Sequence, residues 1–506
     1  MSSYVVSAAP STYVVTGGGG SFTGSVYSHS FDTLGTYTVE FQVTDFRNQK
    51  KSGSFQVKVT SSELAYVKIG QGFKIYDTKT GHLSGQLIHD DGRSKNLKTV
   101  LSDGAFVLEV EQSGNKDLWL YDPNVPSLTV LAETAKDDVY QAKTSGNLVF
   151  YRSGSANEYA LYSYDKLRDF TRGVTSGIGS GNDTRSENHP TINSKDWVLF
   201  EASLNQGPAD IWSWDISKSK AAMVSDASVA ESVVASLADG SFILTRIGAG
   251  GETDLYKWSR SGGFVEIGAD LDTATAFTES KTYAGASSNG DVVFTTTDGT
   301  DTDLYVWKAS TGQTKSISKT ANDEQFCGIQ SDGDVVYQIT AGGNVSLYLY
   351  DLSAESSTIA FAGTGHADSS FKKVLSDDKI VFAATAGDLK IMAETGLGAA
   401  VDVGAGSGEQ FQGQTSGGDF VVSVGAGSAD LYLWDASAGN VVAIATAGTS
   451  NTYGGFTSDA RILFVNYDGS NYDLNIWDPT GNTTTAIIED SASSISVAAV
   501  ETVTVP

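Results

Sequence analysis

The six residues Asp430–Asp435 read DLYLWD, and close variants of this hexad recur along most of the chain. Examples are DLWLYD at 117–122, DIWSWD at 210–215, DLYVWK at 303–308 and DLNIWD at 473–478. A stretch repeated in this way either binds a ligand many times or builds one structural unit many times. The spacing of the copies and the residues around them decide between these two interpretations.

The hexad returns every 42 to 50 residues, which divides most of the chain into ten units. The hexads begin at Gly72, Asp117, Ala160, Asp210, Asp254, Asp303, Ser346, Asp388, Asp430 and Asp473. Most units also have a Ser-Asp-Gly turn before the hexad and an Asp-x-x-Gly turn after it, and helical periodicity is missing. Four short strands per unit, joined by Gly and Asp turns, are typical of a β-propeller blade.

The chemistry of the hexad agrees with a blade strand. Leu431 and Leu433 are expected on one side of the strand, and Tyr432 and Trp434 on the other. Because neighbouring blades cover both sides of each sheet in a propeller, both pairs can be buried. The closing Asp435 can accept a hydrogen bond from the backbone N–H two residues later and fix the turn.

The repeat resembles the TolB-like members of the WD-type propeller superfamily. The resemblance rests on SDGDVVY at 331–337 and DLYLWDASAG at 430–439, and it extends over residues 62–506. It implies an all-β fold with a propeller of about ten four-stranded blades. It implies no function, because propellers serve binding, scaffolding and catalysis alike.

Ten units can close as one ring of ten blades or as two rings of five. The even spacing across the fifth and sixth units leaves no room for a linker and favours one ring. The first unit has little room for an inner strand, whereas residues 494–505 form an extra strand-like segment. We therefore predict that this C-terminal strand completes the first unit and closes the ring.

Residues 37–43 and 55–59 alternate apolar and polar side chains, which predicts a hairpin of two strands with one buried face. The segments HSF at 29–31, GTYTV at 35–39 and VTD at 43–45 resemble PKD-type and HYR-type immunoglobulin-like domains, although the W-x-F-G-D-G stretch of that family is absent. The resemblance implies an Ig-like domain over residues 1–61 that acts as a spacer or docking module. The propeller is expected to follow over residues 62–506.

The charge of the chain limits its partners. It contains 33 Lys and Arg against 60 Asp and Glu, for a net charge of −27, and such a surface repels nucleic acid. No apolar run is long enough for a membrane helix, so membrane insertion is not expected. The N-terminus lacks the basic and apolar regions of a standard signal peptide. Low Cys and Lys with abundant Gly, Ser, Thr and Asp indicate an extracellular setting or a virion or appendage surface.

Catalytic motifs are missing from the sequence. It contains no H-E-x-x-H or G-x-S-x-G motif. His89-Asp90-Asp91 and Glu187-Asn188-His189 place a histidine beside a carboxylate, which permits acid–base chemistry, but two such pairs in an acidic chain are expected by chance. We therefore predict no catalytic residues.

One group of carboxylates has the composition of a metal site. Asp298, Asp301 and Asp303 are separated by small residues, and closely spaced carboxylate oxygens suit Ca²⁺. Since each hexad tends to start with Asp, the last of these three also has a simple turn role. Ca²⁺ is the sole cofactor that the sequence indicates.

The sequence predicts a non-enzymatic binding or structural protein, either a virion or appendage component or a surface adhesin. Its expected partners are protein subunits of a larger assembly or a surface glycan. The alternative is a secreted polysaccharide-active enzyme, a lyase or a glycosidase. In both cases, function is expected in the loops that differ between units, such as 88–96, 176–190 and 296–303.

Overall fold

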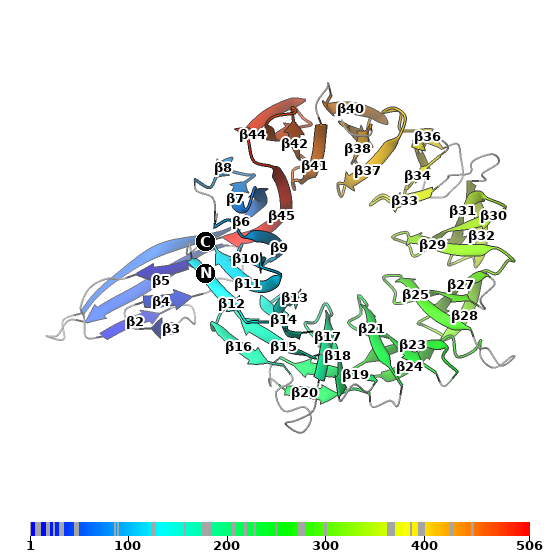
Figure 1. Cartoon of the computed structure of the whole chain (residues 1–506), viewed down its shortest axis with the longest axis horizontal. Helices are drawn as coiled ribbons and strands as arrows, with labels where there is room; N and C mark the ends of the chain where they lie inside the picture. Colours follow the sequence, from blue (N-terminus) through cyan, green and yellow to red (C-terminus); the bar gives the residue numbers. More distant parts are fainter. Residues whose placement is uncertain are drawn as a thin grey trace.

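In the computed structural model, the chain forms one ring of ten blades with an N-terminal group of strands beside it (Figure 1). The described residues are 2–5, 12–16, 21–23, 26–29 and 35–44, for which the backbone alone is described, and 50–505 apart from short gaps. The gaps are 86–87, 89–90, 124–126, 156–157, 175–184, 205–207, 217–219, 226–228, 249, 272–278, 298–300, 362–369, 385–386, 393–399, 426–428 and 447–449. The predicted single ring is confirmed, and the alternative of two five-bladed rings is excluded.

The blades follow one another along the chain, and each is a four-stranded antiparallel sheet whose first strand lines the centre of the ring. Blades 2 to 4 contain β9 (Ser94–Val100), β10 (Phe106–Gln112), β11 (Asn115–Asp122) and β12 (Ser127–Ala132); β13 (Asp137–Lys143), β14 (Leu148–Ser155), β15 (Glu158–Asp165) and β16 (Phe170–Gly173); and β17 (Arg185–Ile192), β18 (Val198–Leu204), β19 (Ala209–Asp215) and β20 (Lys220–Met223). Blades 5 to 7 contain β21 (Glu231–Ser236), β22 (Phe242–Ile247), β23 (Thr253–Ser259) and β24 (Gly263–Ile267); β25 (Ser280–Ala286), β26 (Val292–Thr297), β27 (Thr302–Lys308) and β28 (Gln313–Ser318); and β29 (Asp323–Ile329), β30 (Val335–Ala341), β31 (Asn344–Asp351) and β32 (Ser356–Phe361). Blades 8 to 10 contain β33 (Ser370–Val374), β34 (Ile380–Ala383), β35 (Leu389–Met392) and β36 (Val401–Asp402); β37 (Glu409–Gln414), β38 (Phe420–Val424), β39 (Asp430–Asp435) and β40 (Asn440–Ala445); and β41 (Ser450–Phe456), β42 (Ile462–Tyr467), β43 (Tyr472–Asp478) and β44 (Thr483–Ser491).

Blade 1 joins the two ends of the propeller. It contains β6 (Lys50–Ile69), β7 (Gly72–Asp77), β8 (His82–Leu83) and the C-terminal strand β45 (Ile495–Val505). β45 is its inner strand and runs antiparallel to β6, with Ile495 opposite Ile69 and Val505 opposite Thr60. The last strand of the chain therefore completes the first blade.

The hexad is the third strand of each blade, and its two sides pack against different neighbours. In β39, Leu431 and Leu433 pack on blade 10 with Phe464. Trp434 packs on the opposite side, against blade 8 with Val381. The predicted division of the hexad between two blade interfaces is thus confirmed, although Tyr432 is only half-buried.

The Asp that ends the hexad fixes the following turn. The Oδ1 atom of Asp435 accepts hydrogen bonds from the backbone N–H groups of Ser437 and Ala438, both at 2.9 Å. The hydrogen bond from the Ser437 hydroxyl and those from the two amides hold the pKa of Asp435 below its usual value. Asp351 does the same in blade 7. The predicted role of the repeated Asp is confirmed.

The N-terminal strands are β1 (Ser2–Val5), β2 (Thr12–Thr16), β3 (Ser21–Thr23), β4 (Val26–His29) and β5 (Gly35–Thr44). The predicted hairpin is present, because β5 pairs with β6 and places Tyr37 opposite Val57. β6 then continues past residue 61 into blade 1, so the two parts share one strand (Figure 1). The PKD-type or HYR-type identity of residues 1–61 stays a prediction.

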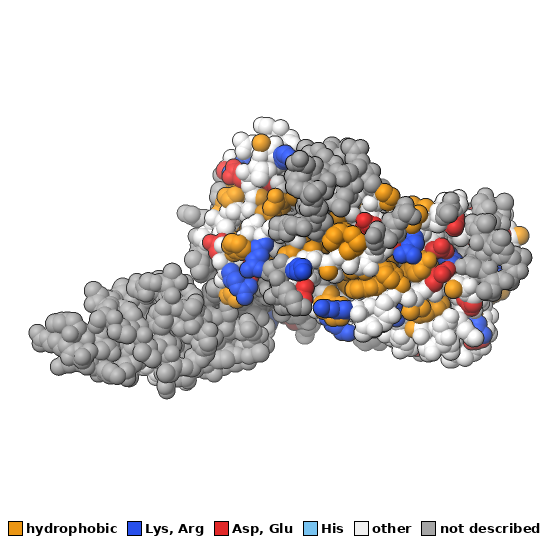
Figure 2. All heavy atoms as spheres, turned by 90° about the horizontal axis from the view of Figure 1, so that it is seen from below, with side chains coloured by type: hydrophobic (Ala, Val, Ile, Leu, Met, Phe, Trp, Pro, Cys, Tyr) orange, Lys and Arg blue, Asp and Glu red, His pale blue; other side chains and the backbone are white. Residues whose placement is uncertain are grey.

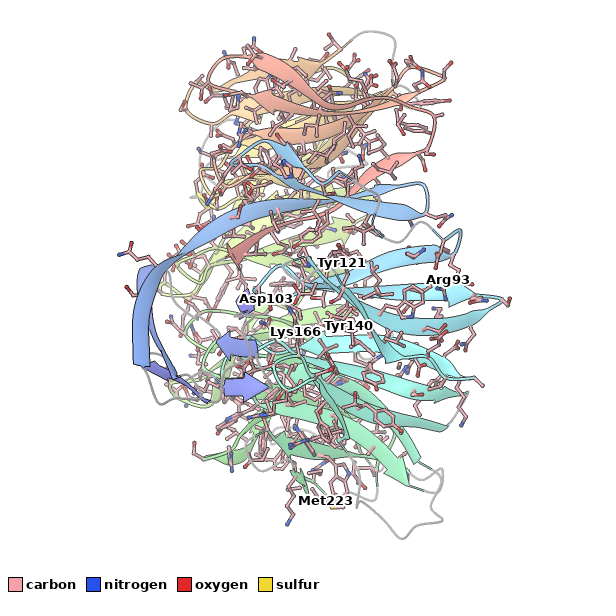
Figure 3. The ribbon with its side chains drawn as sticks, turned by 90° about the vertical axis from the view of Figure 1, so that its left-hand side faces the viewer. Arg93, Asp103, Tyr121, Tyr140, Lys166 and Met223 are labelled. Atoms are coloured by element: carbon pink, nitrogen blue, oxygen red, sulfur yellow. The ribbon has the colours of Figure 1, made fainter. Side chains whose placement is uncertain are left out.

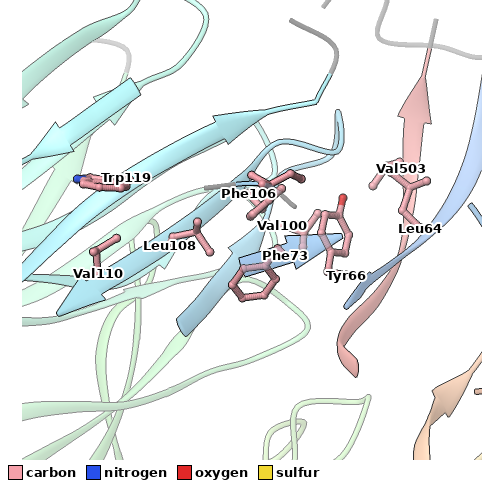
Figure 4. Packing of buried hydrophobic residues seen from close by; sticks show 10 residues of the cluster. Leu64, Tyr66, Phe73, Val100, Phe106, Leu108, Val110, Trp119 and Val503 are labelled. Carbon is pink, nitrogen blue, oxygen red and sulfur yellow. The ribbon is translucent and has the colours of Figure 1, made fainter. Parts of the chain in front are cut away.

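Side chains of blades 1 and 2 meet in one apolar cluster (Figure 4). The rings of Tyr66 and Phe106 meet edge to face, with centroids 5.2 Å apart. The Tyr66 hydroxyl donates a hydrogen bond of 2.9 Å to the carbonyl of Gly104. Val503 of β45 belongs to the same cluster. The closing strand is therefore packed into the core as well as paired in the sheet.

Candidate functional site

The ring has two faces that differ in their connections. The turns between first and second strands and between third and fourth strands lie on one face, here called the turn face. The connections between second and third strands and the links from one blade to the next lie on the other, the loop face. Figure 3 shows Asp103 and Lys166 of the turn face on the side opposite Arg93 of the loop face.

The turns of the turn face are hydrogen-bonded from blade to blade. The Asn147 side chain accepts from the Ser102 amide at 2.9 Å and donates to the Ser102 hydroxyl at 2.8 Å. Lys166 of blade 3 bridges Asp103 at 2.6 Å and Asp122 at 2.8 Å, both in blade 2. Such bonds hold neighbouring blades in register, so we assign these turns to the framework of the ring.

A cavity of about 280 Å³ opens on the turn face between blades 6 and 7. It is lined by Asn289, Asp291, Lys308, Asp332, Asp334, Asp351, Leu352 and Ser353. The Oδ1 atoms of Asp291 and Asp334 accept hydrogen bonds from backbone amides in the adjoining turns, at 2.8 and 3.0 Å. Since Asp351 also serves its own turn, the carboxylates of this cavity are engaged in turn structure.

The loop face is built on buried polar side chains at the start of the inner strands. In seven blades, the first or second residue of the inner strand has at most 4% of its surface exposed although it is polar or charged. These residues are Lys95, Asp138, Glu231, Lys281, Glu324, Glu409 and Asn451. Several of them bind the link that precedes their own strand, and they thereby anchor the loops of this face.

Glu409 shows how such an anchor works. Its Oε1 atom accepts hydrogen bonds from the amides of Ala405 at 2.6 Å and Gly406 at 3.0 Å, in the link before β37. Its Oε2 atom accepts from the amide of Leu389 at 2.6 Å, in blade 8. Desolvation raises the pKa of Glu409, although the three amides favour the carboxylate. One side chain thus holds a link and the preceding blade together.

Glu324 is buried in the same way but is less well paired. Its Oε1 atom accepts from the hydroxyls of Ser318 and Thr320, at 3.0 and 2.6 Å. Its Oε2 atom has no hydrogen-bond partner among the described residues. Burial raises the pKa of Glu324 above its usual value. The charge on this carboxylate is therefore only partly compensated.

The unpaired oxygen and raised pKa of Glu324 give a pH-dependent prediction. A carboxylate whose pKa is raised by folding contributes stability that is complete below its unfolded pKa and is lost as the pH rises through its folded pKa. We expect Glu324→Gln to raise the free energy of unfolding at pH 7 by on the order of 1 kcal/mol, with little change at pH 4. Urea unfolding of the parent and the variant at both pH values measures this.

Glu409→Gln is the matched control. Both carboxylate oxygens of Glu409 accept hydrogen bonds from backbone N–H groups, whereas a glutamine has one oxygen and one NH₂ donor. Either the amides of Ala405 and Gly406 or the amide of Leu389 would therefore lose their acceptor. The free energy of unfolding should fall by about 1–3 kcal/mol at pH 7. Equal effects of the two substitutions at pH 7 would contradict the difference in pairing.

The sequence signal for the anchors is their distance from the hexad. They precede its first residue by 21 to 23 positions, and Glu187 has the same spacing in blade 4. Their residue types vary between Lys, Asp, Glu and Asn, so residue identity alone does not reveal them. Their nearly constant distance from the hexad is the signal that identifies them.

Of the two histidine–carboxylate pairs of the sequence, the side chain of Asp91 is described, and it lies on the loop face, in the link before β9. Asp91 forms ion pairs with Arg93, at 2.6 Å, and with Lys95. Burial opposes ionisation of Asp91, but the hydrogen bonds from Lys95 and Arg93 outweigh it and hold its pKa below the usual value. His89, Asp90 and the side chains of Glu187, Asn188 and His189 lie outside the described residues.

Of the calcium candidates, Asp301 and Asp303 are described, and they lie on the loop face, at the start of β27. Asp298 is outside the described residues. Asp303 is buried, and its Oδ2 atom is 3.3 Å from the ammonium of Lys319. The described residues contain no group of three or more His, Cys, Asp or Glu that could hold a metal ion. Ca²⁺ binding by Asp298, Asp301 and Asp303 stays a prediction.

Comparison with solved structures finds other propellers. The tricorn protease matches with a TM-score of 0.35 and 10% identity over 90% of this chain and 51% of that chain, so this chain spans about half the length of that protease. TolB from Acinetobacter baumannii matches with a TM-score of 0.26 and 15% identity, over 68% of this chain and 78% of that chain. An oligogalacturonate lyase in complex with manganese matches with a TM-score of 0.35 and 11% identity, over 67% and 99%. No family model matches the chain, and no curated protein matches its sequence.

These matches agree with the propeller part of the resemblance noted in the sequence, and at such scores they say nothing about a substrate. Because proteases and lyases are among them, the prediction of a non-enzymatic protein is wrong as an inference from the fold, and we correct it. The physical reason is that a site on a propeller gathers residues from separate blades. The absence of a short catalytic motif therefore excluded nothing. No helix among the described residues is long and apolar enough to cross a membrane.

Proposed function

We propose that the propeller is a recognition module and that its loop face carries the binding surface. The observation behind this proposal is the length of the connections. The turns between first and second strands have four or five residues in all nine blades where the chain forms them. The links between successive blades, in contrast, range from 3 to 12 residues. Uniform connections support a repeated framework, whereas variable loops on a rigid scaffold are where binding residues concentrate.

The loop anchors add to this proposal. Glu409, Asp138 and Lys95 each fix part of a link by hydrogen bonds. A link held at its end by a buried side chain loses less conformational entropy on binding than a free one. The loop face therefore combines variation in length with fixed attachment points.

We assign this module to an extracellular setting or to a virion or appendage surface, with a surface glycan or a protein subunit as its ligand. The charge of −27 disfavours nucleic acid. The N-terminal strands lie on the turn-face side of the ring (Figure 3). A docking role for residues 1–61 would therefore leave the loop face accessible.

The test replaces a long link with a short one. The 12-residue link 268–279 is exchanged for the four-residue link 319–322, which joins the next pair of blades. Binding is measured on an array of glycans and of acidic and neutral polysaccharides. We expect the variant with the short link to lose the binding that the parent protein shows, while its thermal midpoint stays unchanged.

The control shortens a connection on the opposite face. The eight-residue connection 393–400 on the turn face is replaced by the four-residue turn 352–355. This variant should bind as the parent does, and loss of binding in both variants would refute the assignment to the loop face. Cleavage of a polysaccharide by the parent would replace recognition with the alternative of a lyase or glycosidase.

A further inference from the structure

The outer rim of the ring carries exposed apolar side chains that are unevenly distributed. Of the eleven large apolar side chains exposed in the described part of the chain, eight lie between residues 167 and 265. Six of these are on the outer strands or outer turns of blades 3 to 5: Leu167, Phe170, Ile216, Met223, Phe264 and Val265. Single apolar side chains are normal on a surface, but a cluster over adjacent elements marks an interaction site.

Basic side chains accompany this cluster. Arg168 and Arg260 are exposed by 70% and 57% of their side-chain surface. The guanidinium of Arg172 lies 5.2 Å from the centre of the Phe170 ring. Lys220, at the start of β20, is exposed as well. We call these ten residues the basic rim patch, and Figure 2 shows hydrophobic side chains together with Lys and Arg on this side of the rim.

A second cluster on the rim has the opposite charge. Ile359 on β32 and Val401 on β36 are exposed by 54% and 53%, on the neighbouring blades 7 and 8. Glu355 precedes Ile359 by four positions and Asp402 directly follows Val401, with 47% and 56% of their side chains exposed. We call these four residues the acidic rim patch. Their ion pairs with Lys315 and Lys390 are at the surface and so contribute little stability.

The charge of the whole chain follows the same division. Residues 1–260 contain 24 Lys and Arg against 29 Asp and Glu, for a net charge of −5. Residues 261–506 contain 9 against 31, for a net charge of −22. The basic rim patch thus belongs to the nearly neutral part of the chain, and the acidic rim patch to the strongly acidic part.

We propose that the protein assembles head to tail, with the basic rim patch of one copy docked on the acidic rim patch of a second copy. Within one copy the two patches cannot meet, because they lie on separate arcs of the ring (Figure 1). A contact between two different surfaces of identical chains is heterologous and leaves one patch of each kind free at the ends. The outer strands β16, β20, β24, β32 and β36 are the edge strands of their sheets, so the surfaces that meet are built on sheet edges.

This assembly is independent of the recognition role of the loop face, and it is tested without a ligand. Sedimentation velocity of the full chain at rising concentration and low salt should show species larger than the monomer. High salt should weaken them, because the charge attraction between the patches is screened. A parent protein that stays monomeric at low salt would refute the proposal. In that case the partner of the basic rim patch would be a different protein.

Two variants then identify the surfaces. Phe170→Ser with Phe264→Ser disables the basic rim patch, and Ile359→Ser with Val401→Ser disables the acidic rim patch. Since all four side chains are exposed, the thermal midpoint should not change. Each variant alone should associate at least about tenfold more weakly than the parent.

Mixing the two variants gives the decisive result. One copy still has an intact acidic patch and the other an intact basic patch, so the mixture should form a 1:1 dimer that grows no further. Val130→Ser with Ile247→Ser changes exposed apolar side chains outside both patches and should assemble as the parent does. Self-association of either disabled variant alone that is as strong as that of the parent, or no dimer in the mixture, would overturn the head-to-tail contact.

Discussion

A chain that ends at Ser491, and therefore lacks β45, should lose the cooperative unfolding of the ring. The strand supplies the inner position of blade 1 and pairs with β6 from Thr60 to Ile69. Its Ile495 and Val503 are buried, and loss of these two side chains alone costs about 3–6 kcal/mol. Its removal also exposes Ala65 and Val67 of β6 to solvent. We expect a lower thermal midpoint and a broader transition, measured by calorimetry.

Two hydrogen bonds join blade 1 to blade 10 without involving β45. Glu63 of blade 1 accepts a hydrogen bond from the amide of Ser458 in blade 10, and Arg461 donates to the carbonyl of Thr78 at 2.6 Å. These bonds, and the packing of Tyr76 in one cluster with Leu463 of blade 10, would remain in the truncated chain but would have to hold the ring without the closing strand.

Addition of a peptide covering residues 494–506 should restore the sharp transition if the strand itself closes the ring. Thr502→Ser, at an exposed position of β45, should leave the thermal midpoint unchanged, whereas Val503→Ser should lower the midpoint. A truncated chain that unfolds as the parent does would show that blade 1 needs no fourth strand.

The blade count and the packing of the hexad could be predicted because both depend on local repetition. Leu431 and Trp434 lie on opposite sides of one strand, and a strand with two apolar sides must be covered on both sides. Asp435 acts on amides two and three positions away. Interactions this local leave a pattern that repeats in every unit.

The bonds between blades could not be predicted in the same way. Ser331 donates its amide hydrogen to Asp378, 47 positions later, and Glu63 reaches Ser458 across nearly the whole chain. Such partners depend on how the blades are rotated against each other. The anchors of the loop face lie between these cases, because their spacing to the hexad is regular but their residue types differ. The rim patches depend on which outer strands are exposed, and the sequence pattern of those strands is weak.

The error about enzymatic activity has a similar origin. Sequence motifs detect catalytic groups that are close along the chain, such as those on one helix or one turn. In a ring of blades, neighbouring loops on one face are about one repeat apart in sequence. The loop face can therefore assemble residues whose proximity no spacing rule reveals.

Trp434→Ala should cost about 3–5 kcal/mol in the free energy of unfolding. The indole is 6% exposed and packs with Phe420 of its own blade and Val381 of blade 8, so its removal leaves a cavity at a blade interface. Tyr432→Ala in the same strand is the matched control, and it should cost clearly less because Tyr432 is half-buried. Both are measured by urea unfolding. If Trp434→Ala keeps its stability but loses binding to a ligand of the parent, the hexad is a binding element and not the packing strand of each blade.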